Sequence, residues 1–316
     1  MANTPVIVLD DTLTDIANAI RGKNGSSDTY KPGQMADAID NIPAGTSGIP
    51  REVSQAGVYG YPNQDFTFSL PSNATDVING ALTNAFYTCP RLTSVDLSSL
   101  TAVSGGNAFN SAFHGCTSLT SVSFSALTTV SGNKAFYYAF FNCTSLTSVS
   151  FPALTTVDGV SAFNDAFSNC SRLTSVDLSS LTTVSGSGAF GSAFSNCSRL
   201  TSVDLSSLTT VSGNSAFNSA FYSCTSLTSV DLSSLTTVSG SGAFSFAFNS
   251  CTSLTSVSFP ALTTSSFGTA TDQFNNMLRG VTGCTVHFPA AIQGKIETMT
   301  GYPNFSGTNT TVLFDL

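Results

Sequence analysis

The sequence contains no tryptophan, only two histidines and few charged residues, which make up 9% of its 316 positions. Ten basic residues are scattered along a chain of formal net charge −8, so no basic stripe is available for nucleic acid or an anionic membrane surface. No apolar run approaches the roughly 20 residues that a transmembrane helix needs. The first residues also lack the basic and apolar segments of a secretory signal. We therefore expect a chain that is made in a cytoplasm and neither inserts into a membrane nor binds nucleic acid.

Residues that commonly carry catalysis or bind metals are equally sparse. His114 and His287 fall in different parts of the chain, and no Cys-x2-Cys or His-x3-His pair is present. A transition-metal site needs such closely spaced ligands. We therefore expect no enzyme activity, no cofactor and no metal centre.

What the sequence has in abundance is a repeat of 27 residues. The leucines, valines and phenylalanines recur in one register between regularly spaced cysteines. A fixed period of this length is typical of a solenoid, in which each repeat is one turn stacked on the last. The repeated cysteines are Cys89, Cys116, Cys143, Cys170, Cys197, Cys224 and Cys251.

Each turn has two apolar segments. In the first regular turn, Leu92, Val95 and Leu97 have the spacing of a strand that points its side chains inward. Phe109 and Phe113, each preceded by alanine, lie four residues apart, which predicts a short helix with both rings on the core. A single turn buries too little apolar surface to offset the entropy of ordering its backbone, so the turns must stack.

The cysteines should line up one above another, about 4.8 Å apart, the strand spacing. Parallel side chains then keep the Cβ atoms farther apart than the roughly 3.8 Å that a disulfide prefers. We interpret these cysteines as reduced, buried thiols that act as small hydrophobes. Cys284 lies outside the register and has no obvious partner.

Irregular turns flank the array. Counting back one period places Phe68 at the Val95 position, which predicts a degenerate first turn. At the other end, a helix-like stretch at 269–278 precedes a last strand whose Val286 aligns with Val257. Eight steps of about 4.8 Å between these ends predict a rod of roughly 38 Å.

An amphipathic helical hairpin is predicted ahead of the array, over residues 11–42, because apolar side chains recur at helical spacing on both sides of a turn at Asn24-Gly25. Two helices of about ten residues are marginal alone, so they should pack on another chain or a larger assembly. The residues expected to anchor the chain in this way are Leu13, Ile16, Ile20, Met35 and Ile39. The predicted boundaries are 1–43 for the hairpin, 44–50 for a linker, 51–88 for the N-terminal cap and degenerate first turn, 89–283 for the solenoid and 284–316 for the C-terminal cap.

Two parts of the chain resemble known families. The stretch LTDIANAIRGKNGSSDTYKPGQMADAIDNIP is similar to a helical-hairpin module near the N-terminus of structural proteins, often tail proteins, of phages and prophages of Gram-positive gut bacteria. The pattern Ala-Phe-x2-Cys-x2-Leu-x2-Val-x-Leu, over residues 62–300, resembles the BspA-like class of bacterial leucine-rich repeats. The first resemblance implies attachment to a virion. The second implies a solenoid with a parallel sheet on one face and a role in adhesion or recognition.

Some turns carry aromatic side chains at outward positions where most turns have Asn, Ser, Gly or Asp. Because amphipathic aromatic side chains concentrate at interfaces, we predict that these rings contact a ligand or partner. The alternatives are drift on an unimportant surface and packing against the N-terminal segment. The candidate residues are Tyr137, Tyr138, Phe141, Tyr222 and Phe246.

Two further rows recur on the outward strand face. Asp177, Asp204 and Asp231 occupy one position in successive turns. We favour a solvated row partnered by Arg172 and Arg199, with a calcium site as the alternative. Thr-Ser pairs recur on the same face and suit either hydrogen bonding to a glycan or a merely soluble surface.

The sequence thus predicts an α/β solenoid, a leucine-rich-repeat rod with strands on one face and short helices on the other. We expect a virion-associated phage or prophage tail or surface protein, anchored to virion structural proteins by its hairpin, whose rod binds a host-surface glycan or protein. It could act as a single chain or a homo-oligomer. The alternatives are a bacterial surface or interaction protein outside any virion, and an architectural decoration subunit without a ligand.

Overall fold

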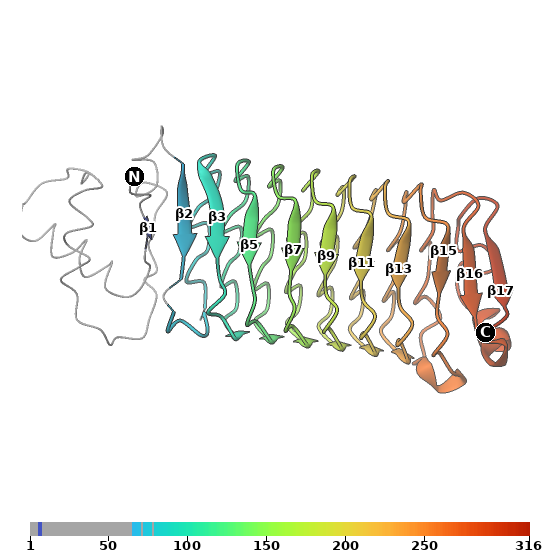
Figure 1. Cartoon of the computed structure of the whole chain (residues 1–316). Coiled ribbons are helices and arrows are strands. Elements are labelled where there is room, and N and C mark those ends of the chain that lie inside the picture. Colours follow the sequence, from blue (N-terminus) through green and yellow to red (C-terminus); the bar gives the residue numbers. More distant parts are fainter. Residues whose placement is uncertain (1–5, 8–64, 71, 78) are drawn as a thin grey trace, which may run out of the picture.

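The computed structural model describes residues 6–7, 65–70, 72–77 and 79–316. From residue 65 onward the chain winds as a row of stacked turns with strands side by side along one face (Figure 1). The solenoid predicted from the repeat is confirmed. The predicted helical hairpin, with its five anchoring residues, lies outside the described residues.

The long strands pair in parallel, each with the strand of a neighbouring turn. The 27-residue period sets the register, since Val176 lies opposite Val203 and Val203 opposite Val230. These valines point inward and are almost fully buried, whereas the serines before them face out. The long strands are β2 (Phe66–Ser69), β3 (Leu92–Asp96), β5 (Ser121–Ser123), β7 (Ser148–Ser150), β9 (Ser175–Asp177), β11 (Ser202–Asp204), β13 (Ser229–Asp231), β15 (Ser256–Ser258), β16 (Thr285–Phe288) and β17 (Thr311–Phe314).

A second parallel sheet of two-residue strands runs along another side of the rod without interruption. Five of its six strands are a threonine followed by a buried valine, and in β4 an alanine takes the place of the threonine. The threonine that precedes each strand reinforces the stack, as Thr155 Oγ1 does by donating to the carbonyl oxygen of Thr128 at 3.1 Å. The strands are β4 (Ala102–Val103), β6 (Thr129–Val130), β8 (Thr156–Val157), β10 (Thr183–Val184), β12 (Thr210–Val211) and β14 (Thr237–Val238).

The short helices predicted around the phenylalanine pairs are wrong. These segments are consecutive turns in which backbone N–H groups alternate between two partners. Ala112 donates to Phe109 of its own turn (3.0 Å), and Phe113 donates to Ala139 of the next turn (2.8 Å). An α-helix would use these N–H groups internally and leave none for the neighbouring turn.

The helix-like stretch predicted at 269–278 is likewise a run of turns. In the described part of the chain, no helix has the length and apolar character needed to cross a bilayer. Short helices lie toward the C-terminus: η1 (Thr264–Ser266), η2 (Ala290–Ile292) and α4 (Gln293–Ile296).

Every fourth residue of the phenylalanine segments has a left-handed backbone. Ser111 (φ 52°), Asp165 (φ 54°) and Ser192 (φ 50°) take equivalent positions in different turns. This conformation prevents each local turn from continuing as a helix. Glycine and short polar residues adopt it at lower cost than large side chains.

Two columns of phenylalanine rings fill the interior. Phe163, Phe190 and Phe217 stack nearly parallel with 5.1 Å between successive centroids, and Phe167 lies 5.5 Å from Phe194 in the second column. All five side chains are fully buried. Burial of one such ring contributes about 1.5–3 kcal/mol, and a stacked aromatic pair adds about 0.5–1.5 kcal/mol. The columns therefore supply much of the cohesion between turns.

The cysteine ladder is buried as predicted from Cys116 to Cys251, whereas Cys89, its first member, is only half-buried. Cys170 and Cys197 have no exposed surface. Their thiols donate to carbonyl oxygens of the preceding turn, Cys170 to Phe140 and Cys197 to Phe167, each at 3.2 Å. Burial raises the pKa of Cys170 to about 12, so the thiol stays neutral and is a poor nucleophile. All eight cysteines are free.

Pairing on the long-strand face stops at two places. β5 does not pair with β7, and β13 does not pair with β15. The second sheet continues past the first point through the pairing of β6 with β8, but it ends with β14, beyond which only an isolated bridge joins Val238 to Phe267. Val122 of β5 and Val230 of β13 are 8% and 7% exposed, against 1–3% for the equivalent valines of β3, β7, β9, β11 and β15. Both interruptions precede the only two Ser-Phe-Pro-Ala sequences in the chain, at 150–153 and 258–261. The larger phenylalanine and the fixed φ of proline distinguish these turns from their Leu-Ser counterparts.

Both ends of the stack follow the predicted alignment. Phe68 lies opposite Val95, and Val257 lies opposite Val286. The C-terminal cap adds one further rung, in which Val312 of β17 pairs beside Val286. At the N-terminal end, β1 (Val6–Ile7) pairs in parallel with β2.

The phenylalanine columns can be tested with one cavity-forming substitution. Phe163→Ala removes a buried ring that stacks on both neighbours, and it should lower the free energy of unfolding by about 3–5 kcal/mol. Urea denaturation followed by circular dichroism measures this. Tyr222→Ala is the control, since Tyr222 is 39% exposed and should cost less than about 1 kcal/mol. Equal losses in the two variants would contradict a core built on the columns.

The cysteine ladder predicts loss of stability at alkaline pH. The ordinary thiol pKa is 9.0, whereas Cys170 and Cys251 titrate at about 12 in the folded chain. Raised pKa values stabilise the fold fully below the unfolded value, and that stability is lost as pH rises from about 9 through about 12. Each thiol should contribute up to about 1.4 kcal/mol per pH unit in that window. Chemical denaturation across the window should show a shallower decline for Cys170→Ala than for the native chain. Identical declines would contradict the ladder's role.

Candidate functional site

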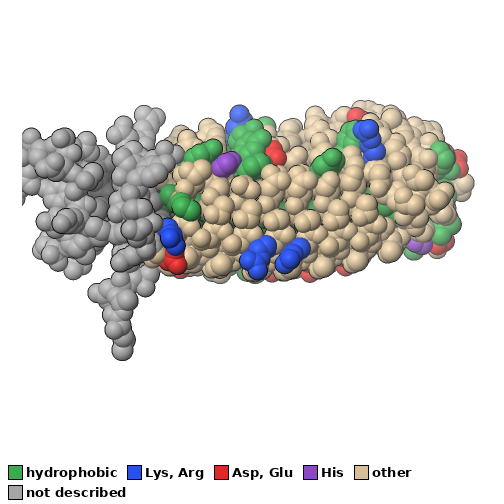
Figure 2. Space-filling model, turned by 90° about the horizontal axis from the view of Figure 1, so that it is seen from above, with side chains coloured by type: hydrophobic (Ala, Val, Ile, Leu, Met, Phe, Trp, Pro, Cys, Tyr) green, Lys and Arg blue, Asp and Glu red, His purple; other side chains and the backbone are tan. Residues whose placement is uncertain are grey.

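Aromatic side chains from three neighbouring turns meet on the outside of the rod. Tyr87, His114 and Phe141 occupy one repeat position, and their rings stack at 4.5 and 5.0 Å with planes inclined by 12° and 10°. Tyr138 lies 5.2 Å from Phe141, and Tyr137 meets Tyr138 edge to face at 4.5 Å. We call these five residues the aromatic cluster. Figure 2 shows hydrophobic side chains grouped beside a histidine on a face that is otherwise mostly uncharged and polar.

Polar groups border the aromatic cluster. Lys134 Nζ lies 5.3 Å from the centroid of the Tyr137 ring, a cation–π contact. Asp165 of the next turn hydrogen-bonds Tyr138. Burial, the Asp165 charge and Tyr137 raise the pKa of Tyr138 to about 12. Burial also raises the pKa of Asp165, and the bond from Tyr138 partly offsets this. At neutral pH the site therefore offers a protonated phenol beside a carboxyl group.

The backbone under the aromatic cluster is strained. Lys134 (φ 55°) and Tyr138 (φ 54°) both occupy left-handed positions, where other turns have Asn, Ser, Asp or Gly, apart from Phe246 (φ 55°) at the Tyr138 position. Large side chains in this conformation cost roughly 1–2 kcal/mol. Such strain tends to occur at functional sites. A tyrosine at position 138 therefore does not stabilise the fold, and its presence needs another explanation.

His114 contributes a ring plane to the aromatic cluster. Burial lowers its pKa, although its own backbone opposes the shift, so the imidazole is neutral at physiological pH. Its Nδ1 atom is buried and has no hydrogen-bond partner. Flanked on both faces by Tyr87 and Phe141, the ring lacks the paired acceptor that orients a catalytic histidine.

The structure brings together three of the five aromatic residues singled out from the sequence, Tyr137, Tyr138 and Phe141. Tyr222 shares the Phe141 position but lies three turns away, and Phe246 lies four turns from Tyr138. Neither has an aromatic contact within the described residues. Sequence reasoning missed Tyr87 and His114 as partners. The 27-residue period was the available signal, since it places both in register with Phe141.

The predicted partnership of the aspartate row with Arg172 and Arg199 is wrong. Each carboxylate instead accepts the N–H two residues on, as Asp204 Oδ1 does from Ser206 at 3.0 Å. Neither arginine has a hydrogen bond or ion pair among the described residues. In the same part of the chain, no three His, Cys, Asp or Glu side chains are grouped so as to hold a metal ion.

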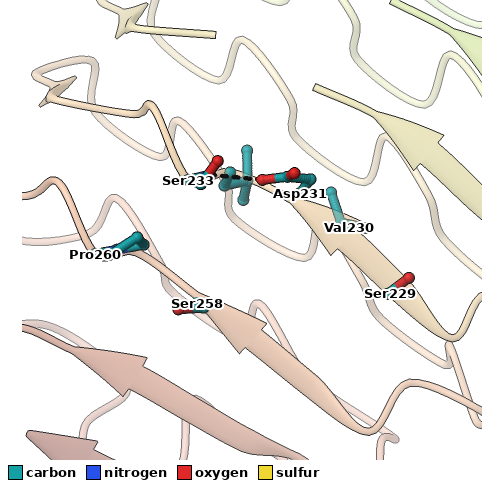
Figure 3. Close-up of a pocket in the computed structure, with 7 residues that line it drawn as sticks. Ser229, Val230, Asp231, Ser233, Ser258 and Pro260 are labelled. Carbon is teal, nitrogen blue, oxygen red and sulfur yellow. Dashed lines mark hydrogen bonds between the residues drawn. The ribbon is translucent and has the colours of Figure 1, made fainter. Parts of the chain in front are cut away.

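An open hollow of about 340 Å³ lies on the long-strand face, where β13 and β15 separate. In Figure 3, Asp231 and Ser233 of one turn lie across from Ser258 and Pro260 of the next. Asp231 is the only titratable lining residue, and its carboxylate already accepts the Ser233 N–H at 2.9 Å. The hollow offers hydroxyl groups but no paired nucleophile and base.

Comparison with known proteins identifies the repeat. The sequence matches the BspA type leucine rich repeat region over residues 66–163, 137–245 and 191–276, which together cover about two thirds of the chain. No curated protein matches it.

Several solved structures are similar to the chain. A leucine-rich-repeat protein of T. pallidum is 28% identical, with 61% of this chain and 79% of that one covered and a TM-score of 0.41. A leucine-rich-repeat protein of Bacteroides ovatus is 18% identical (78% and 87% covered, TM-score 0.25), and a leucine-rich cell surface protein of Faecalibacterium prausnitzii is 18% identical (79% and 88%, TM-score 0.26). With its repeats matched over residues 66–276, the chain belongs to the family of BspA type leucine-rich-repeat proteins.

Proposed function

We propose that this protein is a non-enzymatic recognition and adhesion rod that binds a cell-surface glycan through the aromatic cluster. One observation carries the proposal: five rings from three turns converge on the surface, one of them on a strained, left-handed backbone that most other turns give to small residues. The stacked core would serve as a rigid support that holds these rings in place without a ligand.

The chemistry of the aromatic cluster suits a sugar better than a flat protein surface. Sugar rings have faces of C–H groups, which are attracted to the electron-rich faces and edges of aromatic side chains. Their hydroxyl groups can pair with the Tyr138 hydroxyl and the Asp165 carboxyl group. Five half-buried rings form too small an area for a stable protein interface, which needs about 800 Å² from each partner.

Two substitutions taken from other turns test this proposal. Tyr138→Ser with Phe141→Ser reproduces Ser111 and Ser168 at the same repeat positions. Because serine tolerates the left-handed backbone better, the free energy of unfolding should stay within about 1 kcal/mol of the native value. Binding of the labelled full-length chain to a glycan array and to candidate host cells should fall at least about tenfold.

Tyr222→Ser is the control, because it removes an exposed ring outside the aromatic cluster and should leave binding unchanged. Unchanged binding by the double variant would overturn the proposal. Cell binding that survives periodate oxidation of the surface glycans, yet is lost in the double variant, would identify a protein ligand instead.

The structure to which the rod is attached, a virion or a bacterial cell, is a separate part of the proposal. Only the sequence of residues 11–42 favours attachment to a virion, with the rod displayed outward. The alternatives are a bacterial surface and a decoration subunit without ligand. Immunogold labelling with an antibody to the repeats should mark purified phage or prophage particles. Label confined to bacterial cell walls would exclude the virion, and a regular array on particles that bind no cells would favour decoration.

A further inference from the structure

Arg172 and Arg199 are a second unusual feature of the rod surface. They occupy the same repeat position in adjacent turns, two residues after the ladder cysteine, and both are exposed. Arg91, at the same position near the N-terminal end, is paired with Asp65 at 3.5 Å. The other regular turns have serine there: Ser118, Ser145, Ser226 and Ser253.

No group within the described residues neutralises this pair. The nearest carboxylates in sequence, Asp177 and Asp204, accept backbone N–H groups from the residues two positions on. Neighbouring turns are about 4.8 Å apart, so the two like charges repel one another. A pair that adds nothing to the fold, in a chain with so few basic residues, indicates binding of an anion from outside.

The arginine pair and the aromatic cluster lie within reach of one ligand. Ser168 takes the Phe141 position in the next turn, and Arg172 follows it by four residues. Four residues span at most about 14 Å, and one turn adds about 4.8 Å along the rod. Figure 2 shows two basic side chains next to each other on the face that carries the aromatic group. Lys134 adds a third positive charge at the border of the aromatic cluster.

We propose that the glycan is acidic, and that its carboxylate or sulfate groups pair with the guanidinium groups of Arg172 and Arg199 while its sugar rings pack on the aromatic cluster. This inference rests on the proposed function and names its ligand class. A guanidinium group binds a planar or tetrahedral oxyanion through two parallel N–H···O bonds, a geometry that lysine lacks. The Asp165 carboxyl group is already engaged by Tyr138, so the acidic groups are expected on the arginine side.

Matched polysaccharides test the charge directly. The full-length chain is immobilised and its binding measured to polygalacturonate and to the fully methyl-esterified polymer, and to dextran sulfate and dextran. We expect at least about tenfold tighter binding to one or both acidic polymers than to the neutral partner, weakening as salt is raised. The pair that shows the preference separates carboxylate from sulfate recognition.

Arg172→Ser with Arg199→Ser restores the serine of the other turns and should abolish most of that preference. The control, Arg279→Ser with Lys295→Ser, removes two positive charges near the C-terminal end and should keep it. Equal binding to acidic and neutral polymers, an unaffected arginine variant, or no binding to any of the four would overturn the inference. If neutral glycans bind and Tyr138→Ser with Phe141→Ser abolishes this while the arginine variant does not, the proposed function stands without the acidic ligand.

Discussion

Backbone hydrogen bonds between successive turns are the constraint on which this structure depends. In the phenylalanine segments alternate N–H groups point to the next turn, as Phe113 does to Ala139, and this requires a left-handed residue at every fourth position. Glycine and short polar side chains meet that requirement at lowest cost. The abundance of Ser, Asn and Gly, and the scarcity of charge, are therefore consequences of stacking as much as of solubility.

The phenylalanine rings and the paired strands have different spacings along the rod. Ring centroids in the phenylalanine columns step by 5.1 Å between Phe163 and Phe190 and by 5.6 Å between Phe194 and Phe221. Paired strands prefer about 4.7–4.9 Å. Pairing on the long-strand face nevertheless persists from β7 to β13, where the ring steps reach 5.6 Å, and it is interrupted after β5, where they are 4.9 and 5.1 Å. The ring spacing therefore does not by itself set the two interruptions. The phenylalanine segments hold the stack across both points, as Phe136 does by donating to Ala162 and Phe244 by donating to Gln273. The second sheet also crosses the first point.

The 27-residue period was sufficient to predict the long strands from Phe68 to Val286, their register and the buried cysteines, because identical side chains recur at identical places. It did not reveal the second sheet, whose strands are only two residues long. It failed for the phenylalanine segments, where a spacing of four fits a helix and a chain of turns equally well. What decides between them is the partner of each N–H group, which lies in another turn. The aspartate row failed for a similar reason, since a local bond such as that from Ser206 to Asp204 competes with a distant arginine. In the site, composition singled out Tyr137, Tyr138 and Phe141. Tyr87 and His114 share the Phe141 repeat position, but a shared position does not show that the rings touch, which the structure does.

Native-state amide hydrogen exchange tests most directly whether each turn is stable only when it is stacked on its neighbours. The N–H groups of Phe163, Phe190 and Phe217 each donate to an alanine carbonyl of the next turn at 2.7–2.8 Å. If stacking holds the rod together, these three amides should exchange together and only through cooperative opening, with protection that falls toward the ends of the array. Exchange as fast as in an unstructured peptide, or at unrelated rates in adjacent turns, would contradict the account.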